Sequence, residues 1–548
     1  AAADMRFSTA PQPQGASGEQ GNAWQAPEPT RFDDVVYQLQ NKHVDLKRVI
    51  ESIEKAHGAP LDDAFNPLQK EELYHGMAAK RTQMFEIDEL QPLLKTMTRL
   101  GVEMDAVEEY LHARHAQEAN AVIAARNPDN PNLADGGSGM SNAAAKAYFA
   151  KLDAATKTKL QEVAAQVDAI IEGTRQLYVE YGLEDQQTVD GWRNMFEHYI
   201  PLMREGKEGG MGIGQGFSVK GKEAKSRTGS HRKVVDIIAN IALQRERVIT
   251  RGEKNRVSVA LVGLVALNPN PDFWKREIKP PKVRMFDAEL NKVVERIDPL
   301  YKSRDNVVSA KVLMPDGSVR EEVVEFNADN ARAVRMAKAL KNLDAPAMGA
   351  VLNASAKVVR YVSSINTQYN PVFGPVNMIR DVQSAMLNLS GTPLAGEQAA
   401  ILTGTVSALK DVFVALRDRL NGKEVTSEWG KLLEQFELDG GATGYRDLFK
   451  TSADRADALK KRLEEHKLVD AGALRNPAVA AQQGFGALLN WLDDYNNALE
   501  NATRLSVYKA ALDKGWSAQK AASLAKNMTV NFNRKGAVGS QMGAVYAF

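Results

Sequence analysis

The sequence predicts a mainly α-helical, elongated array of many helices with a small β-hairpin or sheet insertion near residues 280–326. Apolar residues recur at three- and four-residue spacings through most of the chain, which is the period of an amphipathic helix. Loops of helix-breaking residues, such as NPDNPNLADGGSG, separate these periodic stretches. The stretch NVVSAKVLMPDGSVREEVVEF (306–326) gives the clear β signal, because two β-branched runs flank a Pro-Asp-Gly turn.

The composition is that of a folded protein without sulfur-based sites. Of the 548 residues, 44% are hydrophobic and 25% are charged, and 70 basic against 69 acidic residues give a net charge of +1. No overall field therefore favours binding to nucleic acid or to an anionic membrane. The chain has no cysteine, which excludes disulfides, thiolate nucleophiles and zinc sites built on sulfur.

No uninterrupted apolar run reaches the ~18–20 residues that a membrane-spanning helix needs. The longest, VSVALVGLVAL (257–267), is closer to a buried core segment. Membrane insertion would therefore require assembly of several chains or sequence outside this one. The chain begins AAADMRF without an initiator Met and stops in mid-pattern at SQMGAVYAF, so we expect it to be a piece of a longer polypeptide.

The N-terminal part is expected to be helical. Residues 1–30, rich in Pro, Gln, Gly and Ala, are expected to form a flexible tether. An N-terminal helical domain follows over 31–204, with its first helical stretch ending at Asn127. Ser141 or Asn142 is expected to cap the next helix. An apolar stripe over 153–182 ends at Gly182, and a short helix lies within 185–204.

The remaining chain divides into three further parts. A basic, glycine-rich loop is expected over 205–231. A helix with the small β insertion is expected over 232–327, the helix lying near 232–252 with the apolar 257–267 run behind it. A C-terminal helical domain is expected over 328–548 and should continue in a longer parent chain. Its helices are expected near 328–368, 375–389, 395–420, 427–437, 452–466, 476–514 and 517–528.

The glycine-rich loop contains GFSVKGKE (216–223), which matches the first seven positions of a phosphate-binding loop. The eighth position must be Ser or Thr to hold magnesium, and here it is Glu223. No apolar strand precedes the motif and no helix start follows it. The same context weakens a dinucleotide fingerprint built on Gly212, Gly214 and Gly216, so we predict no nucleotide cofactor.

Two histidines on one helix, His112 and His115, lie between Glu109 and Glu118. Their spacing forms a slanted row rather than the i, i+4 histidine pair of a metalloprotease. A polar cluster packed on a neighbouring helix is the favoured interpretation, and no metal site is predicted. The sequence also lacks a G-x-S-x-G elbow. We therefore expect no catalytic residues and no enzyme activity.

Residues 204–256 form the strongest local charge anomaly, with 13 Lys/Arg against 6 Asp/Glu and His231 beside them. Such a segment could follow a phosphate backbone without reading sequence. A solvated loop is the alternative, and Phe217 as the one aromatic residue does not suffice for base stacking. The DNA-binding hypothesis names Lys220, Lys222, Lys225, Arg227, His231, Arg232 and Lys233.

The stretch YNPVFGPVNMIRDVQSA (369–385) predicts a stiff hinge, because Pro371 and Pro375 fix their own φ and restrict the residues before them. Pro375 suits the first turn of the next helix, and Phe373 is expected to fill a core. Asn377, Arg380 and Asp381 then fall in the first turns.

We expect Arg380 to bond a carboxylate of the 476–514 helix, with Glu500 the first candidate, so that the hinge locks two helical layers. Glu500 and Arg504 form a favourable i, i+4 pair on that helix. An ordinary helix start without such a bond is the alternative.

Five stretches together resemble the helical regions of phage large polyvalent proteins, and similar segments occur in internal virion (ejection) proteins of short-tailed phages. The resemblance spans roughly residues 110–548 and is most specific at the Asn-Pro-x-Phe and Glu-Asn-x-x-Arg motifs. The stretches are YLHARHAQEAN (110–120), YIPLMRE (199–205), TQYNPVFGPVNMIRDVQSA (367–385), ENATRLSVYKAALDKG (500–515) and NFNRKG (531–536).

The resemblance implies a structural protein inside the virion that is ejected with the genome and reaches the host envelope, periplasm or cytoplasm. It would form a homo-oligomer that helps DNA cross the envelope. Its partners would be other phage virion proteins and double-stranded DNA bound without sequence specificity, with the envelope membrane as a further candidate. The alternatives are an injected DNA-associated antirestriction protein and a non-catalytic spacer of a larger polyvalent enzyme. The resemblance implies no catalytic residue in this portion.

Overall fold

The computed structural model of the chain describes residues 24–202, 236–287, 292–341, 373–420, 424–441, 456–464, 498–499, 501–528 and 536. The predicted mainly α-helical class with a small β insertion is confirmed. The glycine-rich loop expected at 205–231 lies outside the described residues. Trp24, expected in the tether, is buried against Phe273 and Trp274, so the folded body already includes residue 24.

A long helical rod forms the axis of the N-terminal part. Helices α1 (Arg31–Leu39) and α2 (Val44–His57) precede it. The rod comprises α3 (Pro67–Phe85), the π-turn η2 (Glu86–Leu90) and α4 (Gln91–Leu100). Pro92 has no N–H to continue the i→i−4 ladder, and just before it the Gln91 N–H bonds the carbonyl of Glu86, five residues back. The proline therefore accounts for the π-turn.

Four helices follow the rod: α5 (Met104–Arg126), α6 (Asn142–Lys151), α7 (Ala154–Glu180) and α8 (Gln186–Met195). The Ser141 hydroxyl accepts the Ala144 N–H at 3.1 Å, which confirms Ser141 as the cap of α6. Gly182 follows the end of α7 with φ +60°, as predicted. The predicted stripe of α7 is buried, including Val163, Val167 and Ile170.

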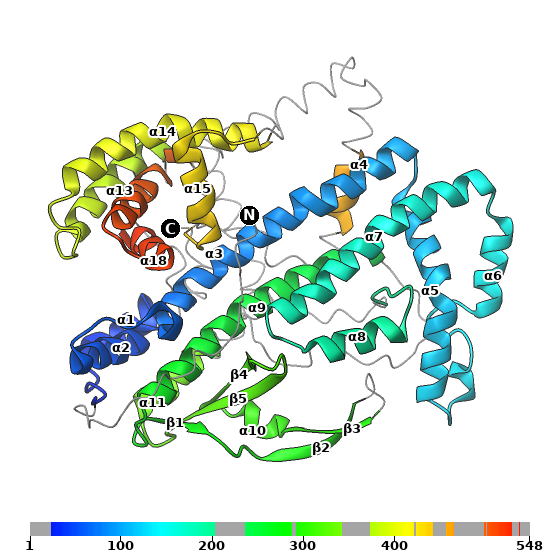
Figure 1. Ribbon diagram of the computed structural model, residues 1–548, viewed down its shortest axis with the longest axis horizontal. Coiled ribbons are helices and arrows are strands. Elements are labelled where there is room, and N and C mark those ends of the chain that lie inside the picture. The colour runs from blue at the N-terminus through cyan, green and yellow to red at the C-terminus, as the bar shows by residue number, and fades with distance from the viewer. Residues whose placement is uncertain are drawn as a thin grey trace.

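Helix α9 (Ile237–Leu267) corrects the prediction of a helix near 232–252 with a separate apolar run behind it. It is one continuous helix of 31 residues. Its middle, Glu253 to Arg256, is charged and polar, and this pattern suggested a break between two elements. In the fold Glu253 and Lys254 are buried and ion-paired, so the helix continues through them. Figure 1 shows α3, α7 and α9 running side by side.

The β insertion contains two separate antiparallel sheets. Strands β4 (Val307–Leu313) and β5 (Val319–Phe326) form the predicted hairpin, with Gly317 at φ +81° in its turn. β1 (Trp274–Glu277) pairs with the other edge of β5, giving the order β1-β5-β4. β2 (Lys282–Asp287) pairs only with β3 (Lys292–Ile297), and the short helix α10 (Pro299–Ser303) leads back to β4.

The C-terminal helices follow the predicted order where the structure describes them. They are α11 (Ala331–Leu340), α13 (Phe373–Leu389), α14 (Gln398–Leu420), α15 (Glu428–Leu438), helical segments at 456–464 and 501–513, and α18 (Ala518–Met528). The predicted helices at 375–389, 395–420, 427–437 and 517–528 match closely. The helix predicted over 328–368 is wrong in its length, because α11 ends at Leu340 with Lys341 as its cap, and residues 342–368 lie outside the described residues. The helix predicted over 476–514 lies only partly within them.

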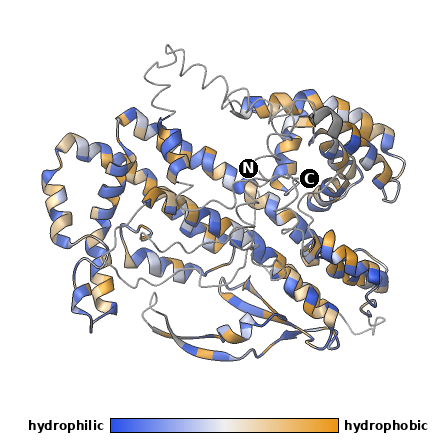
Figure 2. Cartoon of the chain, turned by 180° about the vertical axis from the view of Figure 1, so that it is seen from behind, coloured by the Kyte–Doolittle hydropathy of each residue, from blue (hydrophilic) through white to orange (hydrophobic). Residues whose placement is uncertain are grey.

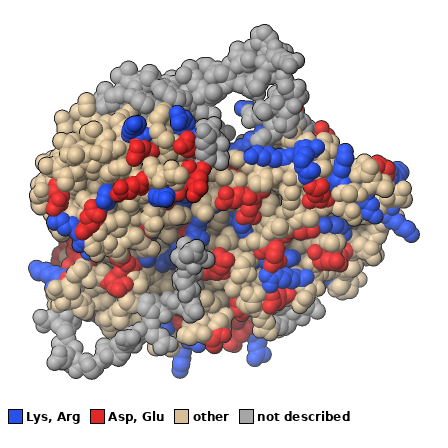
Figure 3. All heavy atoms as spheres, turned by 45° about the horizontal axis from the view of Figure 1, so that its top comes forward, with Lys and Arg blue, Asp and Glu red and all other residues tan. Residues whose placement is uncertain are grey.

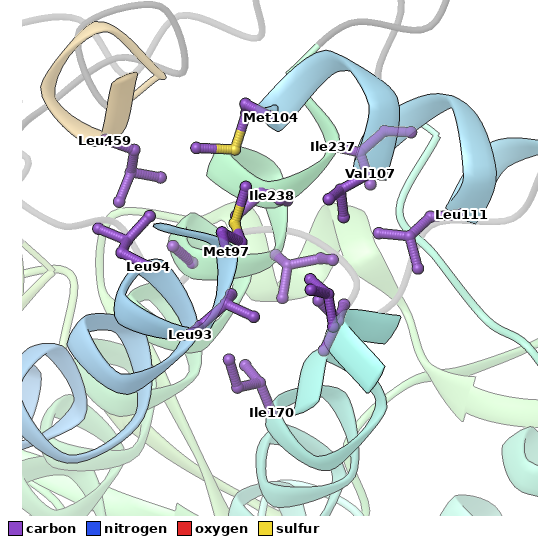
Figure 4. Close-up of a cluster of buried hydrophobic side chains, with 14 of the residues drawn as sticks. Leu93, Leu94, Met97, Met104, Val107, Leu111, Ile170, Ile237, Ile238 and Leu459 are labelled. Atoms are coloured by element: carbon purple, nitrogen blue, oxygen red, sulfur yellow. The ribbon is translucent and has the colours of Figure 1, made fainter. Parts of the chain in front are cut away.

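The α3–η2–α4 rod contributes to three hydrophobic cores. Tyr74 packs with the sheet and α9, and Leu73 packs with α13, α14, α15 and α18. Leu93 and Met97 of α4 join a third core, where Figure 4 shows them facing side chains that include Leu459 of the 456–464 segment. Figure 2 shows hydrophobic residues spread along the long helices rather than gathered in one segment. The cores therefore draw residues from both sides of the predicted domain boundaries.

Candidate functional site

The structure describes some of the residues predicted to form the hinge and its partner, but not all of them. Pro371 and Glu500 lie outside the described residues, so the predicted Arg380–Glu500 bond stays a prediction. Helix α13 begins at Phe373, which places Pro375 in its first turn, where a missing N–H costs nothing. The structure describes the backbone of Phe373, Pro375 and Asn377 but not their side chains.

Beyond the first turn of α13, Arg380 and Asp381 differ sharply in exposure. The Arg380 side chain is 52% exposed and its guanidinium lies 3.7 Å from the carboxylate of Asp381, which is buried. Arg504, the predicted partner of Glu500, is also buried. A polar side chain in this position is expected to be buried only when it is paired, and buried Asp381 lies beside the Arg380 cation.

The seven predicted DNA-contacting residues, from Lys220 to Lys233, lie outside the described residues, as does the GFSVKGKE motif. Over the face that Figure 3 shows, basic and acidic side chains are interspersed. This face therefore has no extended field of one sign.

Helix α14 has an inner face within the core that it shares with α13, α15 and α18, and an outer face of different character. Ile401, Ala408 and Val412 are buried on the inner face, and the Ser506 hydroxyl donates to the Ile401 carbonyl at 2.7 Å. On the outer face Leu402 is 47% exposed and Val406 is 66% exposed. No charged residue occurs from Gln398 to Leu409. A solvent-facing helix surface normally carries charge, so this outer face is unusual.

The expectation that no segment is long and apolar enough to cross a membrane is wrong for α14. By length and composition, Gln398–Asp418 passes that test, and 28% of its most apolar window is buried inside the chain. It is the one such helix found among the described residues. The expectation rested on uninterrupted apolar runs, whereas Thr403, Gly404 and Ser407 interrupt this run while lowering its hydropathy only moderately.

A second notable site is the junction where α3 meets α15 and α18. Gly76 of α3 lies so close to Gly440 that a Cβ at Gly76 would approach the Gly440 carbonyl oxygen to 2.2 Å. Fully buried Lys526 of α18 donates from Nζ to the carbonyls of Glu72 (2.8 Å) and Gly440 (3.1 Å). One ammonium thus ties together three elements that are far apart in sequence.

The electrostatics of this junction are unusual. Burial lowers the pKa of Lys526 to about 7, although the nearby Glu72 carboxylate favours the charged form. Next to the junction, the Tyr508 hydroxyl donates to Asp439 at 2.6 Å. Burial and the Asp439 carboxylate raise the pKa of Tyr508, and burial also raises the pKa of Asp439. The sequence carries one signal of this site, because Lys526 continues the apolar stripe of Ala522.

A third site is the buried charge network between α3 and α9. Glu253 of α9 accepts from Tyr181 (2.9 Å) and pairs with Arg81 (3.1 Å) and Arg256 (2.8 Å). Both guanidinium groups also lie over the Tyr181 ring. Burial raises the pKa of Tyr181 well above its usual value, and the Glu253 carboxylate adds to the shift.

Adjacent in the same network, Lys254 pairs with Glu71 of α3, and His43 lies 3.3 Å from that carboxylate. Burial alone would raise the pKa of Glu71, but Lys254 and His43 outweigh it and hold that pKa far below its usual range. Burial lowers the pKa of His43, which therefore stays neutral near pH 7. These paired charges fix how α3 and α9 pack.

A pocket of 190 Å³ opens beside η2. Arg245 is buried there, pairs with Glu89, and lies over the Phe85 ring. The lining carries two arginines and two carboxylates, so it has no net charge that would select an ion. It comprises Arg81, Met84, Phe85, Asp88, Glu89, Leu177, Arg245 and Ile249.

The two histidines and two glutamates that form a slanted row on α5 have different surroundings. His112 bonds the Ser138 carbonyl at 3.1 Å, and buried His115 packs against the rings of Phe196 and Tyr199. Glu118 accepts the His198 N–H, and Glu109 is exposed. Among the described residues, no three His, Cys, Asp or Glu side chains are placed to hold one metal ion.

No family model, curated protein or solved structure matches this chain.

Proposed function

We propose that the chain is a structural internal virion protein of a phage, ejected with the genome and assembling into an oligomer that helps DNA cross the host envelope. Its role in this proposal is non-catalytic. It would reside in the virion interior and then in the host envelope, periplasm or cytoplasm. The five stretches that resemble helical regions of polyvalent and ejection proteins support the proposal at the level of sequence.

The structural observation that carries the proposal is the outer face of α14. Leu402 and Val406 are exposed on a helix whose first twelve residues carry no charge. Exposing such a surface to water is unfavourable by about 25 cal/mol per Å² of apolar area. A sister chain, another virion protein or the lipid of the envelope would cover it, and each of these is a partner that the proposed function supplies.

The test is assembly of the full chain, followed by sedimentation and electron microscopy with and without liposomes. We expect rings or tubes, and we expect the double substitution Leu402→Glu and Val406→Glu to reduce assembly or liposome association at least tenfold. Leu300→Glu is the matched control, because Leu300 is 77% exposed on α10. It should assemble like the unaltered chain.

Two outcomes would count against this function. One is a chain that remains monomeric at every concentration and ignores liposomes. The other is a double variant that assembles as well as the control. Quantifying the protein in purified virions separates the alternatives, since a channel component should be present in many symmetric copies and an injected antirestriction protein need not be.

A further inference from the structure

The β2–β3 ribbon forms a sheet of its own, and buried Ile297 at one end packs it against Val307 and Val323 of the three-stranded sheet. The ribbon's six residue pairs run from Lys282 opposite Ile297 to Asp287 opposite Lys292, and neither strand pairs with the three-stranded sheet. Figure 1 shows the ribbon along one edge of the molecule, on the side away from α13 and α14. Apart from Ile297, the side chains that the structure describes on the two strands are exposed or half-buried, so they can contact a partner.

Basic residues are concentrated on the ribbon and its flanks. Residues 275–304 contain nine basic and five acidic residues, a net charge of +4, whereas the whole chain carries +1. The rest of the chain is therefore net negative. The basic residues are Lys275, Arg276, Lys279, Lys282, Arg284, Lys292, Arg296, Lys302 and Arg304.

Four of these cations are well placed to meet a partner. Lys279, Lys282, Arg284 and Arg296 are all exposed. The Lys279 ammonium and the Arg284 guanidinium have no ion pair among the described residues, and Lys282 has one at 3.4 Å, with the exposed Glu295. Lys279 and Arg284 can therefore attract an external anion.

The cations are distributed over both faces of the ribbon. Lys282 and Arg284 are two residues apart on β2, so they share one face. Arg296 lies opposite Val283 and therefore on the other face. A strand of six residues spans about 20 Å. The major groove of B-DNA is about 12 Å wide and admits a two-stranded ribbon, with phosphates on both walls.

We propose that the β2–β3 ribbon is a contact for double-stranded DNA, held in a groove by charge and without sequence preference. This inference rests on the proposed function, which supplies DNA as a partner, and it assigns the contact to a surface other than the predicted Lys220–Lys233 loop. Lys279 and Arg284 bind phosphates, and Lys282 and Arg296 add charge from the two faces.

The experiment measures binding of the full chain to a labelled duplex of about 30 base pairs, from about 50 to 200 mM salt. Removing two phosphate contacts in the variant Lys279→Ala and Arg284→Ala should lower the slope of log affinity against log salt by about two. The affinity at low salt should fall about tenfold or more. The matched control is Lys157→Ala and Lys159→Ala, which removes two exposed lysines from α7 and should leave the slope unchanged.

A ribbon variant that binds with an unchanged slope overturns the proposal, and so does an equal loss in the α7 control. A loss confined to Lys220→Ala, Lys222→Ala and Lys225→Ala would place the contact in the loop instead. Binding of the unaltered chain to phosphatidylglycerol vesicles but not to duplex would overturn the DNA contact and assign the ribbon to lipid. Oligomer size in the same samples tests the proposed function separately, because the ribbon variant should assemble normally.

Discussion

Helices α9 and α14 are both long, yet they place their side chains in opposite environments. Glu253 and Lys254 of α9 are charged and buried, whereas Leu402 and Val406 of α14 are apolar and exposed. In α9 each of these charges meets an opposite charge within the chain. On α14 the two apolar side chains stay open to solvent within the described part of the chain. The charges of α9 are thus paired within the chain, whereas we propose that the outer face of α14 is covered by a partner.

The largest effect should come from breaking a charge pair on α9. Lys254→Ala removes the buried cation that pairs with the Glu71 carboxylate, and we expect a loss of about 3–5 kcal/mol in unfolding free energy. Urea denaturation measures this loss. Arg99→Ala, which removes an exposed pair with Glu162, should cost at most about 1 kcal/mol. Equal costs for the two variants would show that the α9 network does not hold the fold together.

A second substitution on α9 tests how tightly it packs. A Cβ at Gly252 would lie 2.1 Å from the ring of Tyr181, so Gly252→Ala should destabilise by about 1–3 kcal/mol although alanine favours helices. A Cβ at Gly191 of α8 would meet no neighbour within 4 Å, and Gly191→Ala should stabilise by about 1 kcal/mol. Thermal melts measure both shifts, and movement in the same direction would contradict tight packing at Gly252.

Lys526 is a buried lysine in a different environment from Lys254. Backbone carbonyls accept hydrogen bonds from Lys526, whereas the Glu71 carboxylate pairs with Lys254. The pKa of Lys526 is about 7 in the fold against an ordinary value of 10.5. Below pH 7 Lys526 is protonated in both the folded and the unfolded chain, and burial of the charged ammonium destabilises the folded state. Between pH 7 and pH 10.5 Lys526 is protonated only in the unfolded chain. The free energy of unfolding should therefore rise by about 1 kcal/mol for each pH unit in this range.

Denaturation of the unaltered chain and of Lys526→Met, at pH 7 and at about pH 9, isolates this contribution from other titrating groups. The stability difference between the two proteins should change with pH in favour of the unaltered chain. A difference that stays constant would mean that Lys526 keeps an ordinary pKa.

The smallest effect on stability should come from the outer face of α14. Leu402→Glu and Val406→Glu together should change the unfolding free energy by less than about 1 kcal/mol, because both side chains are already exposed. Urea denaturation of the monomer measures this change, and the same variant should lose assembly. A large loss of stability in the monomer would show that this face is covered within the chain, and the contrast with α9 would disappear.

Local signals in the sequence predicted local structure well. The Ser141 cap, the end of α7 at Gly182 and the Pro-Asp-Gly turn each depend on a few adjacent residues, and each is confirmed. The continuity of α9 could not be predicted, because a charged stretch is normally exposed and only distant partners such as Glu71 and Arg81 make its burial possible.

The candidate sites were less predictable than the fold for the same reason. Burial of Lys526 depends on Glu72 and Gly440, which are 454 and 86 residues away. The exposure of α14 depends on which faces the other helices leave uncovered. The predicted Arg380–Glu500 bond and the Lys220–Lys233 contact involve residues outside the described chain, and both stay predictions.

The π-turn between α3 and α4 sets the rotational phase of the rod. Each residue of an α-helix advances the side-chain direction by 100°, and the wider turn at Glu86–Leu90 accommodates an extra residue without that advance. Leu93 and Met97 therefore point to a different side from the one that a regular helix continuing Leu73 and Tyr74 would give them. Through this π-turn, Pro92 rotates the side chains of α4 about the rod axis relative to those of α3. One continuous rod can therefore contribute side chains to cores that lie on different sides of it.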